Sequence, residues 1–172
     1  RKVVLCGSSG PSALYKAGAI AAKVVGFFSN KNKPSKFMTN MSFGSYNKKY
    51  EDVRTEFDWL SVNRENVDKY IKDDYCGFTQ SVMFYISFTE NLAKIHKNKM
   101  LKAISKNQQL LLIAGDEDPV GNYGESVEDL HDIYSDLGLD SSLILYEGLR
   151  HEILNEDEKG KVMEDVLSFF ER

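Results

Sequence analysis

The pattern of apolar and polar positions divides the chain into three parts, of which the first and third share one pattern. The first part opens on the apolar run Val3–Cys6, and a Gly-Ser-Ser-Gly-Pro sequence at 7–11 interrupts it. A short continuous apolar run is typical of a strand buried on both faces. Ser12–Phe28 is rich in alanine and apolar residues with lysines at intervals, which predicts a helix.

The third part repeats this order of strand and helix twice. Gln109–Ala114 and Ser142–Tyr146 are apolar runs that predict buried strands. Gly124–Leu137 and Glu156–Phe170 have helical apolar periodicity, and the acidic residues 156–158 would occupy the first turn of the last helix, where the helix dipole favours them. The residues of that helix expected to point inward are Val162, Val166, Leu167, Phe169 and Phe170. Alternating strands and helices indicate an α/β fold with a parallel sheet and a right-handed crossover.

The middle part, roughly Lys36–Lys106, contains no convincing strand. Two helices are predicted here, at Asn63–Asp73 and around Phe88 to Ile95. Twelve aromatic residues lie between Phe37 and Phe88. Such a concentration fits a lid over an apolar cleft or an ordinary helical core, and the pattern alone leaves both interpretations open.

Composition excludes several classes of protein. The chain has 22 basic and 26 acidic residues, which disfavours tracking of nucleic-acid phosphates. No apolar run approaches the roughly 20 residues of a membrane span, so no transmembrane segment is expected. Cys6 and Cys76 form no CxxC pair, which favours a reduced, cytoplasmic setting. Cys6, inside the first strand, is expected to be buried and not to act as a nucleophile.

Candidate chemistry lies in the loops that follow the two strands of the third part. Asp118 comes four residues after Ala114, and His151 comes five residues after Tyr146. Loops after parallel strands gather at the carboxyl edge of the sheet, and neighbouring strands lie about 4.8 Å apart. We therefore expect an Asp118–His151 hydrogen bond, which would orient the imidazole as a general base.

The remaining motifs do not indicate a metal or cofactor. The other histidines, His96 and His131, are expected to be solvated or partly exposed, and no two histidines have HxxxH spacing. There is no Cys/His cluster and no glycine-rich phosphate loop, so we expect neither a metal nor a cofactor.

Two segments resemble the α/β-hydrolases of the monoacylglycerol lipase, lysophospholipase and serine-aminopeptidase-like group. They are AGDEDPVG at 114–121 and YEGLRHEILNE at 146–156. The resemblance implies that Asp118 is the acid of a catalytic triad and His151 its base.

The resemblance extends to the middle part and implies a domain organisation. RTEFDWLS at 54–61 and DYCGF at 74–78 are similar to the helical cap of bacterial members of the group, which favours the lid interpretation. It implies hydrolase core at 1–29, a helical cap at 30–106, and hydrolase core at 107–172. The fold expected is therefore the C-terminal part of an α/β-hydrolase, with three parallel strands, flanking helices and an inserted cap.

The chain departs from the family pattern at the nucleophile. The family's serine lies in a G-x-S-x-G turn, and this chain has none, because Gly-Ser-Ser-Gly at 7–10 has the wrong spacing. By family order Val3–Cys6 would be the sixth strand. We therefore expect the N-terminal part of the same enzyme, upstream of Arg1, to supply the serine. Without that serine the isolated chain is expected to be inactive. A three-stranded sheet with an open edge is a small core, so the isolated chain is also expected to be unstable as a monomer.

The function expected is hydrolysis of lipid-like or aryl carboxylic esters by an acyl-enzyme mechanism. Ser8, Ser9 and Trp59 are expected to contact the substrate, and Arg150 to fix the loop that carries His151. Two alternatives remain open at this point. The missing serine motif fits a non-catalytic interaction module of the same fold. An aminopeptidase could hold a substrate amine with acidic cap residues, for which the candidates are Glu56, Asp58, Glu65 and Asp68.

Overall fold

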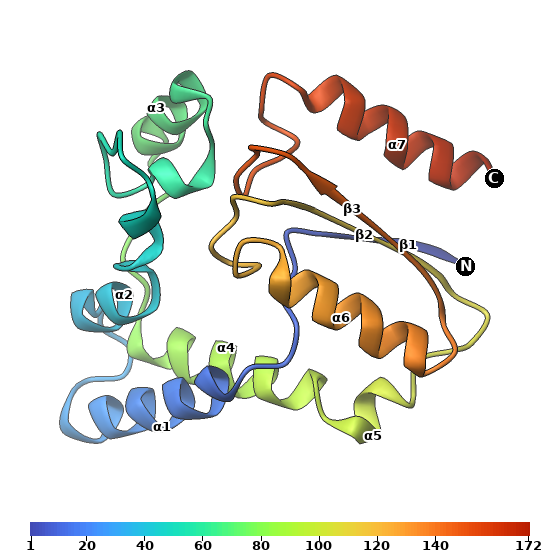
Figure 1. Ribbon diagram of the computed structural model, residues 1–172. Coiled ribbons are helices and arrows are strands. Elements are labelled where there is room, and N and C mark those ends of the chain that lie inside the picture. Colours follow the sequence, from blue (N-terminus) through green and yellow to red (C-terminus); the bar gives the residue numbers. More distant parts are fainter.

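The computed structural model describes residues 1–172 and contains one three-stranded parallel sheet (Figure 1). Its strands are β1 (Lys2–Cys6), β2 (Gln109–Gly115) and β3 (Asp140–Tyr146), in the order β1-β2-β3. The register aligns Leu5 with Leu112, and Leu112 with Leu143. All three predicted strands are present, and their shared direction confirms the parallel arrangement.

Burial differs between the central strand and the first strand. All of β2 after Gln109 is buried, whereas β1 is only partly buried and Cys6 is exposed. The expectation that β1 is buried on both faces and that Cys6 is buried was therefore wrong. The reason is that β1 lies at the edge of this sheet and ends at Cys6, so its last side chain has a neighbouring strand on one side only.

Helices cover both faces of the sheet, as Figure 1 shows for α6 (Glu125–Asp136) and α7 (Lys159–Glu171). Alternate residues of β2 point to opposite faces. Leu110, Leu112 and Ala114 therefore pack with Val127, Leu130 and Tyr134 of α6. Leu111 and Ile113 pack on the other face, in a cluster that includes Val162 of α7.

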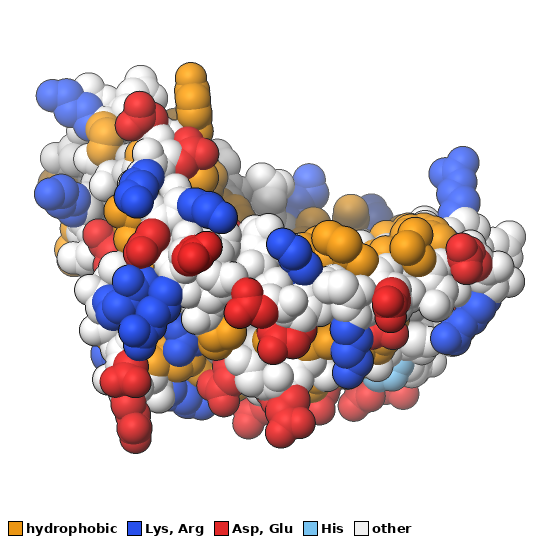
Figure 2. Space-filling view, turned by 90° about the horizontal axis from the view of Figure 1, so that it is seen from above, with side chains coloured by type: hydrophobic (Ala, Val, Ile, Leu, Met, Phe, Trp, Pro, Cys, Tyr) orange, Lys and Arg blue, Asp and Glu red, His pale blue; other side chains and the backbone are white.

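The last helix differs from its prediction in two respects. It begins at Lys159, so the acidic residues 156–158 precede the first turn. Val162, Val166 and Phe169 pack against the sheet as expected, but Leu167 and Phe170 are 59% and 50% exposed. The predicted inward set spans two adjacent stripes of the helix, and the sheet covers only one of them. Figure 2 shows exposed apolar side chains along the region of α7.

The helices between β1 and β2 form a separate layer beside the carboxyl edge of the sheet and below α6 (Figure 1). This layer contains α1 (Ala13–Phe28), α2 (Lys36–Phe43), α3 (Arg64–Lys72), α4 (Val82–Ile95), the short α5 (Asn98–Leu101), and the single-turn helices η1 (Tyr46–Lys49) and η2 (Asp58–Leu60). Serine or asparagine side chains cap α1, α2, α3 and α4 by accepting backbone N–H groups. No helix is both long and apolar enough to cross a membrane.

The position of α1 differs from the expected grouping with the sheet. It packs along α4, and Ala22 shares a buried cluster with Met38 of α2 and with Tyr85 and Ile86 of α4. The physical reason is that the loop at 7–12 leads the chain away from the sheet before the helix begins. The boundaries 1–29, 30–106 and 107–172 remain a prediction, but the contacts of α1 lie with the middle helices.

Candidate active site

The loops after β2 and β3 bring Asp118 and His151 into contact. Asp118 is fully buried, and its Oδ2 lies 2.9 Å from His151 Nδ1. Its other oxygen, Oδ1, accepts a hydrogen bond from the backbone N–H of Val120 at 2.8 Å. The contact predicted from strand topology is therefore present. Because both carboxylate oxygens are held, the carboxylate fixes the orientation of the imidazole.

Two glycines allow the chain to approach His151 this closely. Gly7 has φ +57°, and a β-carbon there would lie 3.1 Å from Cε1 and 3.2 Å from Nδ1 of His151. Gly115 leaves even less room, because a β-carbon there would lie 2.0 Å from the carbonyl oxygen of Leu149. A side chain at either position would displace the loop that carries His151.

An aromatic cluster of the middle helices lies against the ring of His151. The Trp59 ring is 5.4 Å from the His151 ring, inclined at 44°. Trp59 stacks on Phe43 at 6.1 Å and meets the edge of Tyr46 at 5.0 Å. Burial, with a further contribution from the Asp118 charge, raises the pKa of Tyr46 to about 12. Trp59 thus lies beside His151, on a surface that is apolar and uncharged, and its contact with a substrate stays a prediction.

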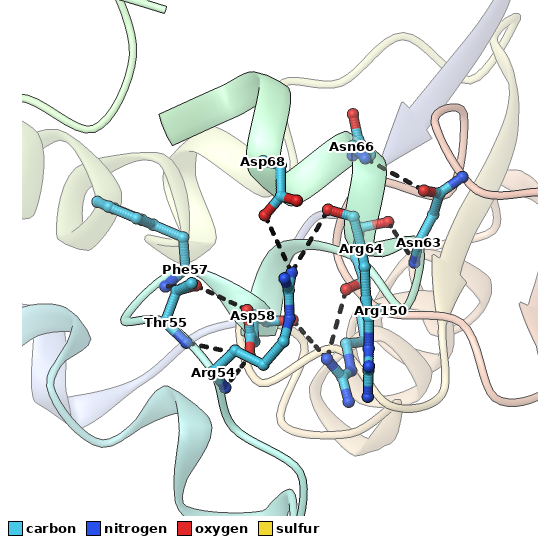
Figure 3. A network of polar contacts seen from close by, with 10 residues as sticks. Arg54, Thr55, Phe57, Asp58, Asn63, Arg64, Asn66, Asp68 and Arg150 are labelled. Carbon is cyan, nitrogen blue, oxygen red and sulfur yellow. Dashed lines mark hydrogen bonds and ion pairs between the residues drawn. The ribbon is translucent and has the colours of Figure 1, made fainter. Parts of the chain in front are cut away.

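Arg150 connects the loop of His151 to the segment that carries Trp59 (Figure 3). Its Nη1 donates to the carbonyl oxygens of Asp58 at 2.6 Å and Ser61 at 3.4 Å. Its guanidinium also lies 3.9 Å from the centre of the Tyr50 ring. These contacts are within the protein, so Arg150 fixes this loop, as expected.

The acidic residues considered for amine binding are partly engaged with other residues of the middle part of the chain. Asp58 is buried and accepts hydrogen bonds from the backbone N–H of Arg54 and from Thr55 Oγ1 at 2.6 Å (Figure 3). Burial acts to raise the pKa of Asp58, but the hydrogen bonds from Thr55 and Arg54 outweigh it and lower the pKa. Asp68 pairs with Arg54 at 3.2 Å. Glu56 and Glu65 are exposed.

Glu156 forms a second connection between the loop of His151 and the segment after η2. It is fully buried and accepts hydrogen bonds from Ser61 Oγ at 2.7 Å and from the backbone N–H groups of Val62 and Asn63 at 2.9 and 3.1 Å. From the sequence, Glu156 was expected in the first turn of the last helix, and its role in this connection was not predicted. The available signal was its position at the end of the His-Glu-Ile-Leu-Asn-Glu segment, five residues after His151.

The serines of the first loop do not contact His151. Ser9 Oγ lies 2.6 Å from the Tyr15 hydroxyl, whereas Ser8 Oγ is buried and has no hydrogen-bond partner. His151 makes its one side-chain hydrogen bond through Nδ1, which leaves Nε2 free. Although Cys6 is exposed, the protein atoms around its thiol partly desolvate it, and this desolvation together with the Asp118 charge raises the pKa of the thiol, which disfavours the reactive thiolate.

Other features of the chain lie outside this site. Two surface cavities, of about 230 and 370 Å³, are both lined in part by His96 and by neither Asp118 nor His151. No three His, Cys, Asp or Glu side chains are arranged to hold a metal ion. The Asp118–His151 pair can orient the imidazole and polarise it for proton transfer through Nε2.

A buried aspartate that orients a histidine, on consecutive loops at the carboxyl edge of a parallel α/β sheet, is the arrangement of the acid and base in α/β-hydrolases. A family model described as serine aminopeptidase, S33, matches residues 3–158. The chain belongs to this family. Comparison with curated proteins by sequence gave no match.

Solved structures share the fold. A thermostable carboxyl esterase from Bacillus coagulans, in complex with glycerol, has 25% identity and a TM-score of 0.89, over 98% of this chain and 55% of that chain. A monoacylglycerol lipase from Paleococcus ferrophilus has 20% identity and a TM-score of 0.63, over 96% of this chain and 56% of that chain. A soluble variant of monoglyceride lipase from Saccharomyces cerevisiae has 18% identity and a TM-score of 0.66, over 98% of this chain and 54% of that chain. The chain thus has the expected α/β-hydrolase fold and spans about half the length of these relatives.

Proposed function

We propose that this chain supplies the acid and the base of a serine hydrolase that cleaves carboxylic esters. The observation that carries the proposal is the 2.9 Å contact between buried Asp118 and His151 Nδ1, with Nε2 free. His151 Nε2 takes the proton of a serine hydroxyl as its oxygen attacks the ester carbonyl. The tetrahedral intermediate then expels the alcohol, which receives that proton. Water repeats the sequence and releases the acid from the acyl-enzyme. Asp118 holds the imidazole and stabilises its charged form.

The proposed source of the nucleophile is the N-terminal part of the same enzyme. Three observations support this: the chain has no G-x-S-x-G, His151 contacts no serine, and the relatives are almost twice as long. The outer edge of β1 is also unpaired, so a further parallel strand can join the sheet beside His151. The isolated chain is then inactive, although it holds two members of the triad.

The proposed substrates are esters with a lipid-like or aryl acyl group. The cluster of Phe43, Tyr46 and Trp59 beside His151 offers an apolar surface to such a group. The names of the relatives, a carboxyl esterase and two monoacylglycerol lipases, point the same way. Peptide cleavage, which the family name carries, has less support, because Asp58 and Asp68 already have partners in the cap.

The test is hydrolysis of p-nitrophenyl esters of several chain lengths by the enzyme that contains this chain. Asp118→Asn is expected to lower kcat by roughly 10⁴-fold and His151→Ala by roughly 10⁶-fold, the losses typical of the acid and the base of a triad. His131→Ala is the matched control. His131 lies on α6, away from the site, and its ring makes a hydrogen bond with Ser141 of β3. Equal rates in His151→Ala and the unaltered enzyme would exclude the proposed mechanism.

Two further measurements separate the alternatives. A fluorophosphonate labels only an activated serine, so absence of labelling in the intact enzyme would favour a non-catalytic interaction module. Faster cleavage of aminoacyl amides than of the corresponding esters would favour an aminopeptidase.

A further inference from the structure

Charge is distributed very unevenly along this chain. Residues 1–50 contain nine of the 22 basic residues and none of the 26 acidic residues. The remaining residues are therefore strongly acidic, and the small overall charge conceals two regions of opposite sign. Such asymmetry indicates an anionic partner for the basic region.

One part of this basic region forms one end of the layer of middle helices. It comprises the last turns of α1, the loop 29–35 and α2, which Figure 1 places at the lower left, far from both termini. Lys31, Lys33 and Lys36 are all exposed here, and none forms an ion pair. Backbone hydrogen bonds to α4 hold the loop: Met83 N–H donates to the Lys31 carbonyl at 2.9 Å, and Val82 N–H donates to the Lys33 carbonyl at 3.3 Å.

Large apolar side chains on the same segments as these lysines are exposed. Phe27 and Phe28 are each 81% exposed, and Phe37 is 62% exposed. We call this surface the basic–aromatic tip, and its members are Val24, Phe27, Phe28, Lys31, Lys33, Lys36, Phe37 and Met41. The neighbouring segment 75–89, which leads into α4 and forms its first turns, has no charged residue. The nearest acids along the chain are Glu51, after α2, and Glu90, which pairs with Lys23 of α1.

A comparison with the exposed apolar stripe of α7 shows why exposed rings and unpaired lysines matter together. Met163, Leu167 and Phe170 are also exposed, but Glu164, Asp165 and Glu171 lie among them on the same helix. Exposed aromatic rings together with unpaired lysines fit an interface at which apolar groups enter and anionic groups remain outside. A lipid surface has this structure, because acyl chains accept the rings while headgroup phosphates attract the lysines.

We infer that the basic–aromatic tip docks on the surface of an anionic phospholipid layer. This inference extends the proposed function, because an enzyme that cleaves lipid-like esters meets its substrate at such a surface. Docking at the tip would hold the cap, with Trp59 and the neighbouring His151, near the lipid source. Binding to a membrane requires no turnover, so the inference can fail while the hydrolysis proposal stands.

The test is sedimentation of the enzyme that contains this chain with vesicles of phosphatidylcholine, alone or mixed with phosphatidylglycerol. Three lysines are expected to favour the anionic vesicles by about a hundredfold in partition coefficient, taking roughly fivefold for each lysine. The preference should fall as salt is added. Equal binding to both vesicle types, or binding to neither, would overturn the inference.

Variants assign the binding to the tip. The triple variant Lys31→Gln, Lys33→Gln, Lys36→Gln should lose the preference for anionic vesicles. Phe27→Ser with Phe28→Ser should weaken binding by at least about tenfold. These side chains are exposed, so thermal melting and hydrolysis of a short, water-soluble ester should stay unchanged.

A matched control and two adverse outcomes complete the experiment. Leu167→Ser with Phe170→Ser removes comparably exposed apolar surface from α7 and should leave vesicle binding within twofold of the unaltered enzyme. If the lysine variant loses binding while the phenylalanine variant keeps it, the tip is a general polyanion site and the inference is wrong. If the phenylalanine variant instead abolishes self-association in the absence of vesicles, a second copy of the chain occupies the tip.

Discussion

At the scale of single residues, the site depends on how closely the backbone approaches one imidazole. His151 has Asp118 on one side, the Trp59 ring on another and the backbone of Gly7 beneath it. Gly7 has no side chain, and a β-carbon at this position would lie only 3.1 Å from the imidazole. The position of His151 therefore depends on Gly7, although Gly7 has no side chain that could take part in the reaction.

Gly7→Ala should lower both stability and activity. A non-glycine residue at φ +57° costs about 1–2 kcal/mol, and the new methyl group would displace the imidazole from the nucleophile. The measurements are thermal unfolding and kcat on a soluble ester. Gly138→Ala is the control, because Gly138 has φ +71° but nothing within 4 Å of its β-carbon position. A similar loss of stability in both variants, with loss of activity only in Gly7→Ala, is expected; equal activities would contradict the role of Gly7.

Asp58 should make the cap sensitive to acid. The folded pKa of Asp58 lies below its ordinary value of 3.8, so its contribution to the free energy of unfolding is fully present above that range. It is lost as pH falls below 3.8 toward the folded pKa, because the protonated group no longer accepts its hydrogen bonds. Asp58→Asn should therefore be less stable at neutral pH and should vary less in stability between pH 5 and pH 2. Urea unfolding at several pH values tests this, with exposed Asp52→Asn as the control; parallel pH profiles would contradict it.

At the scale of elements, two side chains from the β3–α7 connection hold η2 and the segment after it beside His151. Arg150 contacts carbonyl oxygens of η2 and of the segment after it, and Glu156 binds the N–H groups that follow. Trp59 lies in η2 between these attachments. The aromatic surface beside His151 is therefore positioned by contacts from the sheet side and not by the cap helices alone.

Glu156→Gln should destabilise the protein and loosen the cap. The amide places an NH₂ group opposite donors that now bind a carboxylate, which costs about 1–3 kcal/mol for each buried group left unpaired. Trp59 is the one tryptophan of the chain, so its fluorescence reports the position of η2 directly. We expect a red-shifted emission and a lower midpoint in urea. Exposed Glu158→Gln should change neither quantity, and an unshifted emission in Glu156→Gln would contradict the attachment.

At the scale of the whole molecule, the sheet has an open edge. The outer side of β1 has no partner strand, and α7, which covers one face of this sheet, carries exposed apolar residues on the stripe that the sheet does not cover. An unpaired strand edge can pair with another chain. The same edge is where we propose that the nucleophile-bearing part joins.

The isolated 172-residue chain should therefore self-associate. Sedimentation velocity should show a mass that increases with concentration, because the edge of β1 and the apolar stripes are available to other copies. The mechanism predicts less association when the N-terminal part is present. A single species of 19.6 kDa that melts cooperatively at all concentrations would contradict this prediction.

The sequence by itself determined the strands, most of the helices and the meeting of Asp118 with His151. These follow from local periodicity and from the rule that parallel strands end at one edge, and neither needs knowledge of distant contacts. The tertiary structure alone decided that α1 packs on α4, that Cys6 and Leu167 are exposed, and that Glu156 is buried against the segment after η2. Each depends on which distant segment covers a side chain, and a helix or strand pattern gives the direction of a face but not the partner that fills it.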